Sequence, residues 1–165
     1  MAFSPVGLAR KLILSLCFTV QMTAWAGAKD LSGRIGAGVQ NLGPDQVPSL
    51  SVVWQASNAA GIEGNLGLNS VSSFHEYVLG ARLIRALFVE ENQDFAFYAG
   101  AGFISSQPSL GTAKTGYYLH TGMESRFFLP GLPNFGLKFG GGVKLSSAAT
   151  VNFRTEIFAG AHYYF

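Results

Sequence analysis

The chain has 165 residues, of which 48% are hydrophobic, 13% aromatic and only 12% charged, a composition that excludes both an ordinary soluble domain and a disordered chain. Its eleven Lys and Arg outnumber its nine Asp and Glu, but Arg10 and Lys11 lie in a predicted leader, so the remainder is neutral and carries no basic patch that favours nucleic acid. No apolar run after the leader reaches the roughly 20 residues of a transmembrane helix.

Residues 1–28 have the three parts of a bacterial signal peptide: a positive start, an apolar run and a cleavage region of small residues. These parts are carried by Arg10 and Lys11, by Leu12 to Val20, and by Ala24, Ala26 and Ala28. The run is too short to span a bilayer, so we expect cleavage after Ala26 or Ala28 and favour a mature chain of residues 29–165; the alternative is a short anchor that stays attached. The only cysteine, Cys17, follows Leu16 inside the run, which argues against a lipoprotein and leaves the mature chain without a thiol for a disulfide or a metal.

Eight segments of the mature chain alternate apolar residues with polar residues or glycine, the period of a β-strand. They cover residues 34–40, 50–55, 62–69, 76–83, 95–103, 117–124, 135–144 and 153–165. Ten of the eighteen charges of the mature chain fall on the face opposite the apolar one. A soluble sandwich would turn these charges to water, but with an export signal the inverted arrangement fits better, with apolar side chains toward lipid and charges toward a lumen.

An unpaired backbone group costs several kcal/mol in hydrocarbon, so a sheet that enters lipid has to close on itself. We therefore predict an all-β fold, a closed eight-stranded antiparallel up-and-down transmembrane barrel over residues 29–165, and a monomer. The interior of such a barrel is just wide enough for side chains. Its inward charges then have to pair, because a buried charge without a partner is costly.

We predict a ladder of ion pairs in the lumen, formed by Glu63, Glu76, Glu124, Glu156, Arg34, Arg82, Arg126, Lys138, Lys144 and Arg154. The alternative is that these residues line a narrow polar path. Inward glycines are numerous, and we expect them to make room for large side chains such as Tyr98, Tyr118 and Phe158. The alternative for the glycines is a small cavity that holds or passes an apolar ligand.

The outward aromatic residues predict the orientation in the membrane, since amphipathic rings gather at the headgroup level. A dense girdle at one end comprises Trp54, Phe88, Phe95, Phe97, Phe127, Phe128, Phe135, Tyr163 and Phe165; a thinner one comprises Phe74, Phe103, Tyr117 and Phe153. The short connections 57–60, 90–94 and 129–134 suit periplasmic turns at the dense girdle. None of the opposite connections exceeds about ten residues, which argues against an adhesin.

The last strand resembles the C-terminal strand of bacterial outer-membrane barrels, with apolar residues alternating up to a terminal aromatic residue. The assembly signal would comprise Ile157, Tyr163 and Phe165. With the leader, the chain resembles the small barrels of the OmpA and OmpX type, and less closely the ligand-binding OmpW type. This resemblance implies a Gram-negative outer membrane, with outer-membrane lipids and lipopolysaccharide, periplasmic chaperones and the barrel-assembly machinery as partners.

Some small barrels are lipid A-modifying enzymes, so a nucleophile and its base have to be considered. His75, beside Ser72, Ser73 and Glu76, is the one candidate base near the outer rim. No motif of those enzymes is present, and no two histidines share a strand at the spacing of metal ligands. We therefore expect no catalysis, no cofactor and no metal, and a structural or surface role for a barrel with a filled polar lumen.

Overall fold

The computed structural model describes residues 30–42, 47–71, 74–108, 111–147 and 151–165. The predicted signal peptide with Cys17, and the loop serines Ser72 and Ser73, lie outside the described residues, as does the side chain of Phe74. None of the described residues forms a helix that is long and apolar enough to cross a membrane.

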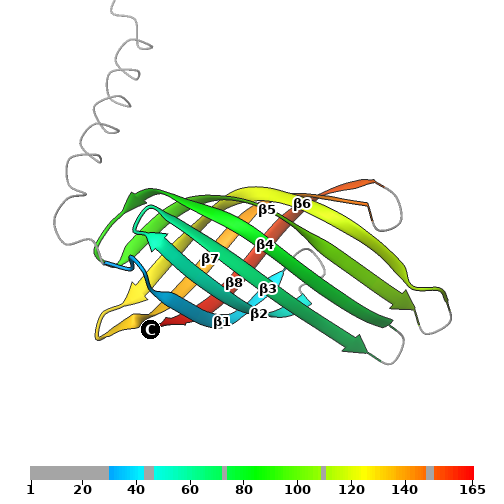
Figure 1. The fold of residues 1–165 in the computed structure, drawn as a ribbon, viewed down its shortest axis with the longest axis horizontal. Coiled ribbons are helices and arrows are strands. Elements are labelled where there is room, and N and C mark those ends of the chain that lie inside the picture. Colours follow the sequence, from blue (N-terminus) through cyan, green and yellow to red (C-terminus); the bar gives the residue numbers. More distant parts are fainter. Residues whose placement is uncertain (1–29, 43–46, 72–73, 109–110, 148–150) are drawn as a thin grey trace, which may run out of the picture.

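The described residues form eight strands that close into one antiparallel barrel (Figure 1). The strands are β1 (Ile35–Leu42), β2 (Val47–Ser57), β3 (Ala60–Val71), β4 (Phe74–Val89), β5 (Gln93–Pro108), β6 (Lys114–Leu129), β7 (Leu132–Ser146) and β8 (Asn152–Tyr164). Each strand pairs with the next in the sequence, and β1 pairs with β8 to close the wall. Each predicted segment overlaps one strand, so the predicted fold class is confirmed.

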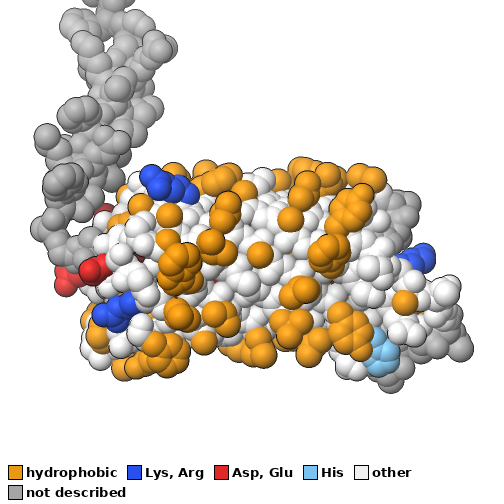
Figure 2. Space-filling view, in the orientation of Figure 1, with side chains coloured by type: hydrophobic (Ala, Val, Ile, Leu, Met, Phe, Trp, Pro, Cys, Tyr) orange, Lys and Arg blue, Asp and Glu red, His pale blue; other side chains and the backbone are white. Residues whose placement is uncertain are grey.

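Side chains alternate between the lumen and the outer surface with the period of a strand. In β2 the alternation of buried and exposed residues is unbroken from Val47 to Ala56. The exposed set is apolar, as at Leu50 and Leu83, each 63% exposed, whereas Arg82 beside Leu83 is 1% exposed. On the face seen in Figure 2 hydrophobic side chains cover the middle of the barrel, and charged ones lie toward its two ends. This distribution is the reverse of that in a soluble protein.

One end of the barrel, named here the terminal end, carries residues 30–34, Phe165 and three short turns. These turns are residues 58–59, 90–92 and 130–131, shorter than predicted because the strands extend further. In the last of them Gly131 has a φ of +84°, a left-handed conformation that glycine adopts without steric cost. The opposite end is named the loop end.

The wall is uneven at the loop end. Strands β4, β5 and β6 each have 16 residues, whereas β1 has 8 and β2 has 11. In Figure 1 the β1–β2 hairpin ends well short of the tips of the green and yellow hairpins. The wall is therefore lowest where the first and last strands meet.

Candidate functional site

The centre of the lumen is an ionic cluster around Glu63 on β3. Arg82 Nη2 donates a hydrogen bond to Glu63 Oε2 at 2.9 Å, and Lys138 Nζ donates to both carboxylate oxygens at 2.7 and 2.8 Å. Ser51 Oγ donates to Glu63 Oε1 at 2.8 Å and lies 2.7 Å from His162 Nε2. All of these side chains are buried, so the carboxylate exchanges its hydration for charge-assisted hydrogen bonds.

Arg82 connects this cluster to the far side of the lumen. Its Nη2 also donates to Glu124 Oε2 on β6 at 2.7 Å. Its guanidinium carbon lies 4.8 Å from the ring centroid of Tyr98 and 4.6 Å from that of Phe158, close enough for cation–π attraction. One arginine thus holds two acids and two rings from four other strands in place.

Two further polar pairs lie beside the central cluster. His120 Nδ1 lies 3.1 Å from Glu156 Oε1, which also accepts a hydrogen bond from the Tyr98 hydroxyl at 3.3 Å. Arg126 forms an ion pair with Asp94 at 2.9 Å. Uncharged side chains such as Tyr98 therefore belong to the polar network together with the charged ones. Hydrogen bonds of this kind satisfy buried charges that water does not reach.

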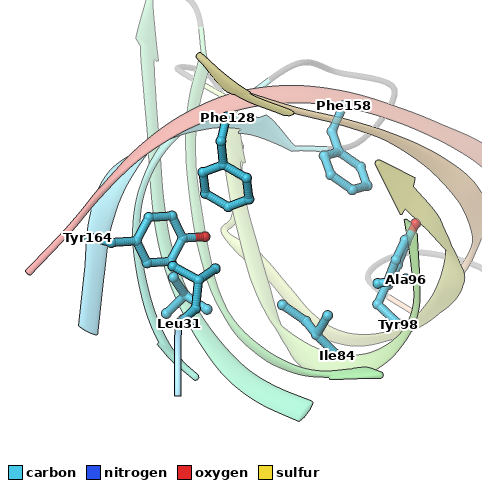
Figure 3. Close-up of a cluster of buried hydrophobic side chains, with 8 residues drawn as sticks. Leu31, Ile84, Ala96, Tyr98, Phe128, Phe158 and Tyr164 are labelled. Carbon is cyan, nitrogen blue, oxygen red and sulfur yellow. The ribbon is translucent and has the colours of Figure 1, made fainter. Parts of the chain in front are cut away.

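Apolar clusters fill the lumen around the ionic centre. One comprises Leu31, Val53, Ile84, Ala96, Tyr98, Phe128, Phe158 and Tyr164, and Figure 3 shows these side chains pointing into the space that the strands enclose. Leu31, from the segment before β1, is held in place because its backbone N–H donates to Asn58 Oδ1 at 2.8 Å. A second cluster, Val47, Val78, Ile104 and Tyr118, lies toward the loop end.

Glycines make room for two tyrosines that reach across the lumen. A Cβ at Gly122 or Gly142 would lie 2.6 Å from the Tyr98 hydroxyl, and one at Gly102 would lie 2.6 Å from that of Tyr118. These distances are far below van der Waals contact, so no larger residue fits without movement. The prediction that inward glycines accommodate large inward side chains is confirmed at these positions.

The predicted charge ladder is placed in the lumen with two exceptions. Eight of its ten residues are buried. Arg34, which precedes β1, is half-buried and donates to Asn134 Oδ1 at 2.9 Å. Arg154 is exposed and lies toward the loop end of β8, beyond the part of that strand that pairs with β1. Both arginines lie near the ends of the barrel wall and not in its buried centre.

Sequence reasoning missed several residues of this interior. Asp94 was assigned to a turn, yet it is 2% exposed and is the partner of Arg126. Ser51 and His162 were not assigned to the ladder, although both reach the Glu63 cluster. The signal was available in their position, since extending the inward alternation through Ala96 and through Tyr164 places Asp94 and His162 inside.

The aromatic girdle is placed at the terminal end with one correction. Trp54, Phe97, Phe127, Tyr163 and Phe165 are exposed, and Phe88 stacks on the half-buried Phe95 with ring centroids 5.3 Å apart. Phe135 is half-buried. Phe128 is not part of the girdle: it is 3% exposed and packs on Tyr164. Adjacent residues of one strand point to opposite faces, so Phe127 and Phe128 cannot both face outward.

The catalytic alternative is not supported by the geometry at His75. Its Nδ1 lies 2.9 Å from Ser70 Oγ in a solvent-exposed contact, and His75 itself is half-buried. Glu76, the acid expected to orient it, is 3% exposed and lies on the lumen face of β4, opposite its neighbour. Among the described residues, no group of three His, Asp or Glu side chains is arranged to hold a metal.

Comparison with known structures identifies the fold. The N-terminal β-barrel domain of Pseudomonas aeruginosa OprF superimposes with a TM-score of 0.61 at 9% identity, covering 81% of this chain and 98% of that one. Neisserial surface protein A gives 0.53 at 17% identity, covering 80% and 95%. No family model and no curated protein sequence matches the chain. The chain has the fold of the small eight-stranded transmembrane barrels of outer membranes.

Proposed function

We propose that the mature chain is a monomeric barrel of the bacterial outer membrane whose lumen is closed by its own side chains. Its role is structural or at the cell surface, and it carries out no catalysis. A cleaved signal peptide exports it, periplasmic chaperones escort it, and the assembly machinery reads the outward residues Ile157, Tyr163 and Phe165 of its last strand. Outer-membrane lipids and lipopolysaccharide surround it.

The outer surface supports the membrane location. Large apolar side chains exposed on every strand would be a severe aggregation hazard in water, whereas in lipid the same surface is the favourable one. The terminal end, with its short turns and dense aromatic girdle, faces the periplasm in this proposal. Phe103, Tyr117 and Phe153, each more than 60% exposed, mark the outer boundary.

The observation that carries the proposal is the filled lumen. An ionic cluster around Glu63 and Arg82 lies at its centre, and apolar side chains pack on both sides of it. Opening a path would require breaking several buried hydrogen bonds at once, which is costly in a low-dielectric interior. This packing supports a stable plug in the membrane over a porin-like channel.

Electrical recording tests this closure directly. The mature chain, inserted into planar bilayers, should pass no sustained current. The double variant Tyr98→Ala with Tyr118→Ala removes two rings that cross the lumen and should open a measurable conductance, which also shows that the chain has inserted. In the membrane fraction of cells, the folded barrel is detected by comparing unboiled and boiled samples on a gel: the chain should migrate more slowly after boiling.

A different recording would favour the narrow polar path. Arg126 forms an ion pair with Asp94 in the interior, so it would line such a path. Small discrete conductance in the unmodified chain that Arg126→Ala abolishes would therefore contradict the closed lumen. Recovery of the processed chain as a freely soluble species would contradict the membrane location itself.

A further inference from the structure

The five residues before β1 lie at the terminal end of the barrel and place one side chain in the lumen. Leu31 is 3% exposed and belongs to the apolar cluster that also contains Phe128 and Tyr164. Figure 3 shows it pointing into the enclosed space together with those rings. The residues on either side of Leu31 are exposed, so this one side chain anchors the segment. We name residues 30–34 the strap.

Few hydrogen bonds attach the strap to the barrel. The backbone N–H of Leu31 donates to Asn58 Oδ1 at 2.8 Å, and that of Gly33 donates to the backbone oxygen of Gln55 at 2.7 Å. Pairing between β1 and β8 begins only at Gly36, so among the described residues the strap is paired with backbone along β2 alone. A short segment with one buried side chain and few hydrogen bonds belongs to the least stable parts of a folded protein.

A buried amide next to the strap lowers the cost of lifting it. The backbone N–H of Gln55 donates to the backbone oxygen of Arg34, and the Gln55 side chain is 1% exposed. Its Nε2 has no hydrogen-bond partner among the described residues. A buried polar group without a partner is costly, and water supplies a partner once it can enter. The hydration that this amide gains therefore offsets part of the cost of opening.

The ionic centre of the lumen does not depend on the strap. Glu63, Arg82 and Lys138 lie on β3, β4 and β7, which are paired with their neighbours along most of their lengths. The ion pairs of Arg82 and Lys138 with Glu63 involve no atom of residues 30–34. Withdrawal of Leu31 therefore leaves these bonds in place.

We propose that the strap is a lid on the lumen at the terminal end, which opens without unfolding the barrel. Opening exposes the apolar site that Leu31 occupies among Val53, Ile84, Phe128 and Tyr164. The site is reached from the terminal end only, because the ionic centre stays closed. The inference goes beyond the proposed function, and only the compartment from which the site is reached, the periplasm, rests on the orientation proposed there.

Thiol labelling of the folded barrel tests the lid. Residues 29–165 contain no cysteine, so one engineered thiol is the only reporter. Val53→Cys places it in the cluster under the strap, and Val78→Cys places it in the apolar cluster toward the loop end; the two valines are 1% and 2% exposed. The chain is refolded in detergent micelles, where a small water-soluble methanethiosulfonate reagent meets both ends, and each rate is divided by the rate in the unfolded chain.

We expect the thiol at position 53 to react about tenfold faster than the one at position 78, or more. Below the unfolding transition urea should hardly change the rate at 53, because opening of a short segment exposes little surface. Equal rates at the two positions, both rising steeply with urea, would overturn the lid, since both thiols would then be reached only by unfolding.

A pair of asparagine variants assigns the motion to the strap. Asn58→Ala removes the acceptor of the Leu31 N–H and should speed the labelling of Val53→Cys about fivefold, equivalent to about 1 kcal/mol. Asn92→Ala is the matched control, since Asn92 is exposed in another turn of the terminal end, and it should leave the rate unchanged. Equal effects of the two variants would contradict this assignment.

Bilayer recording separates the lid from the proposed function. Leu31→Ala should speed the labelling of Val53→Cys and still pass no sustained current, because the ionic centre remains closed. Sustained current in this variant alone would refute a lid confined to the terminal end. Current in the unmodified chain would refute the closed lumen of the proposed function, whereas the labelling rates decide on the lid in either case.

Discussion

The lumen and the outer surface of this barrel are built from the same eight strands but obey opposite rules. Inside, Arg82 is held by two acids and two aromatic rings, so its position depends on specific partner residues. Outside, Leu83 on the same strand needs only to be apolar, because acyl chains make no directional contacts. The lumen therefore determines which structure forms, and the outer surface determines where it resides.

Arg85 is a charged residue on the outer surface, and its position shows where that surface tolerates a charge. It lies on the outward face of β4, opposite Ala60, the first residue of β3, and is exposed. The long side chain of an arginine can reach the headgroup region while its stem stays in the apolar band. The cost of a charge on this surface therefore depends on how far it lies from the end of the barrel.

The largest effect is expected from removing the central acid. Glu63→Leu leaves Arg82 and Lys138 buried without the acceptor that they share, which should reduce the free energy of unfolding by about 3–5 kcal/mol. Urea unfolding of the barrel in lipid vesicles measures this change. Ser51→Ala is the matched control, since it removes one hydrogen bond from an uncharged donor to the same carboxylate and should cost less, about 1.5–3 kcal/mol. Equal costs for the two variants would contradict a lumen organised by charge.

The next largest effect is expected on the lipid-facing surface. Leu83→Arg places a charge near the middle of β4, where the cost should be about 2–4 kcal/mol. Leu87→Arg makes the same change on the same strand near the terminal end, where the cost should be about 0–1 kcal/mol. Both leucines are more than half exposed, so burial does not differ between them. Vesicle unfolding of the pair measures the depth of the apolar band, and similar costs would mean that the outer surface does not lie in lipid.

The fold could be predicted from the sequence because one signal, alternation with a period of two, runs through the whole mature chain. The period places Trp54 outside and Gln55 inside whichever partners they meet. Strand ends were less predictable: β4 extends to Val89, beyond the expected 76–83 segment, because a bulge between Ala86 and Phe88 interrupts the alternation. The exposed Leu87 and Phe88 are consecutive for this reason.

The lumen could be predicted only as a set of inward residues and not as a list of partners. Glu63 and Lys138 are 75 residues apart in the sequence, and their contact depends on the curvature of the closed barrel. Neither the choice of Asp94 for Arg126 nor that of His120 for Glu156 follows from alternation.

The smallest effect is expected from replacing a glycine by alanine, once in the lumen and once on the outer surface. At Gly122 a Cβ would lie 2.6 Å from the Tyr98 hydroxyl and 2.6 Å from Gly142 Cα, so Gly122→Ala should reduce the free energy of unfolding by about 1–3 kcal/mol through overpacking. At the outward Gly64 a Cβ would meet nothing within 4 Å. Gly64→Ala should instead raise the free energy of unfolding by about 0.4–1 kcal/mol, because alanine has less freedom to lose from the unfolded chain. Opposite signs in the same vesicle assay would show that packing limits the lumen while lipid tolerates added volume, and a loss at Gly64 as large as that at Gly122 would contradict this difference between the two faces.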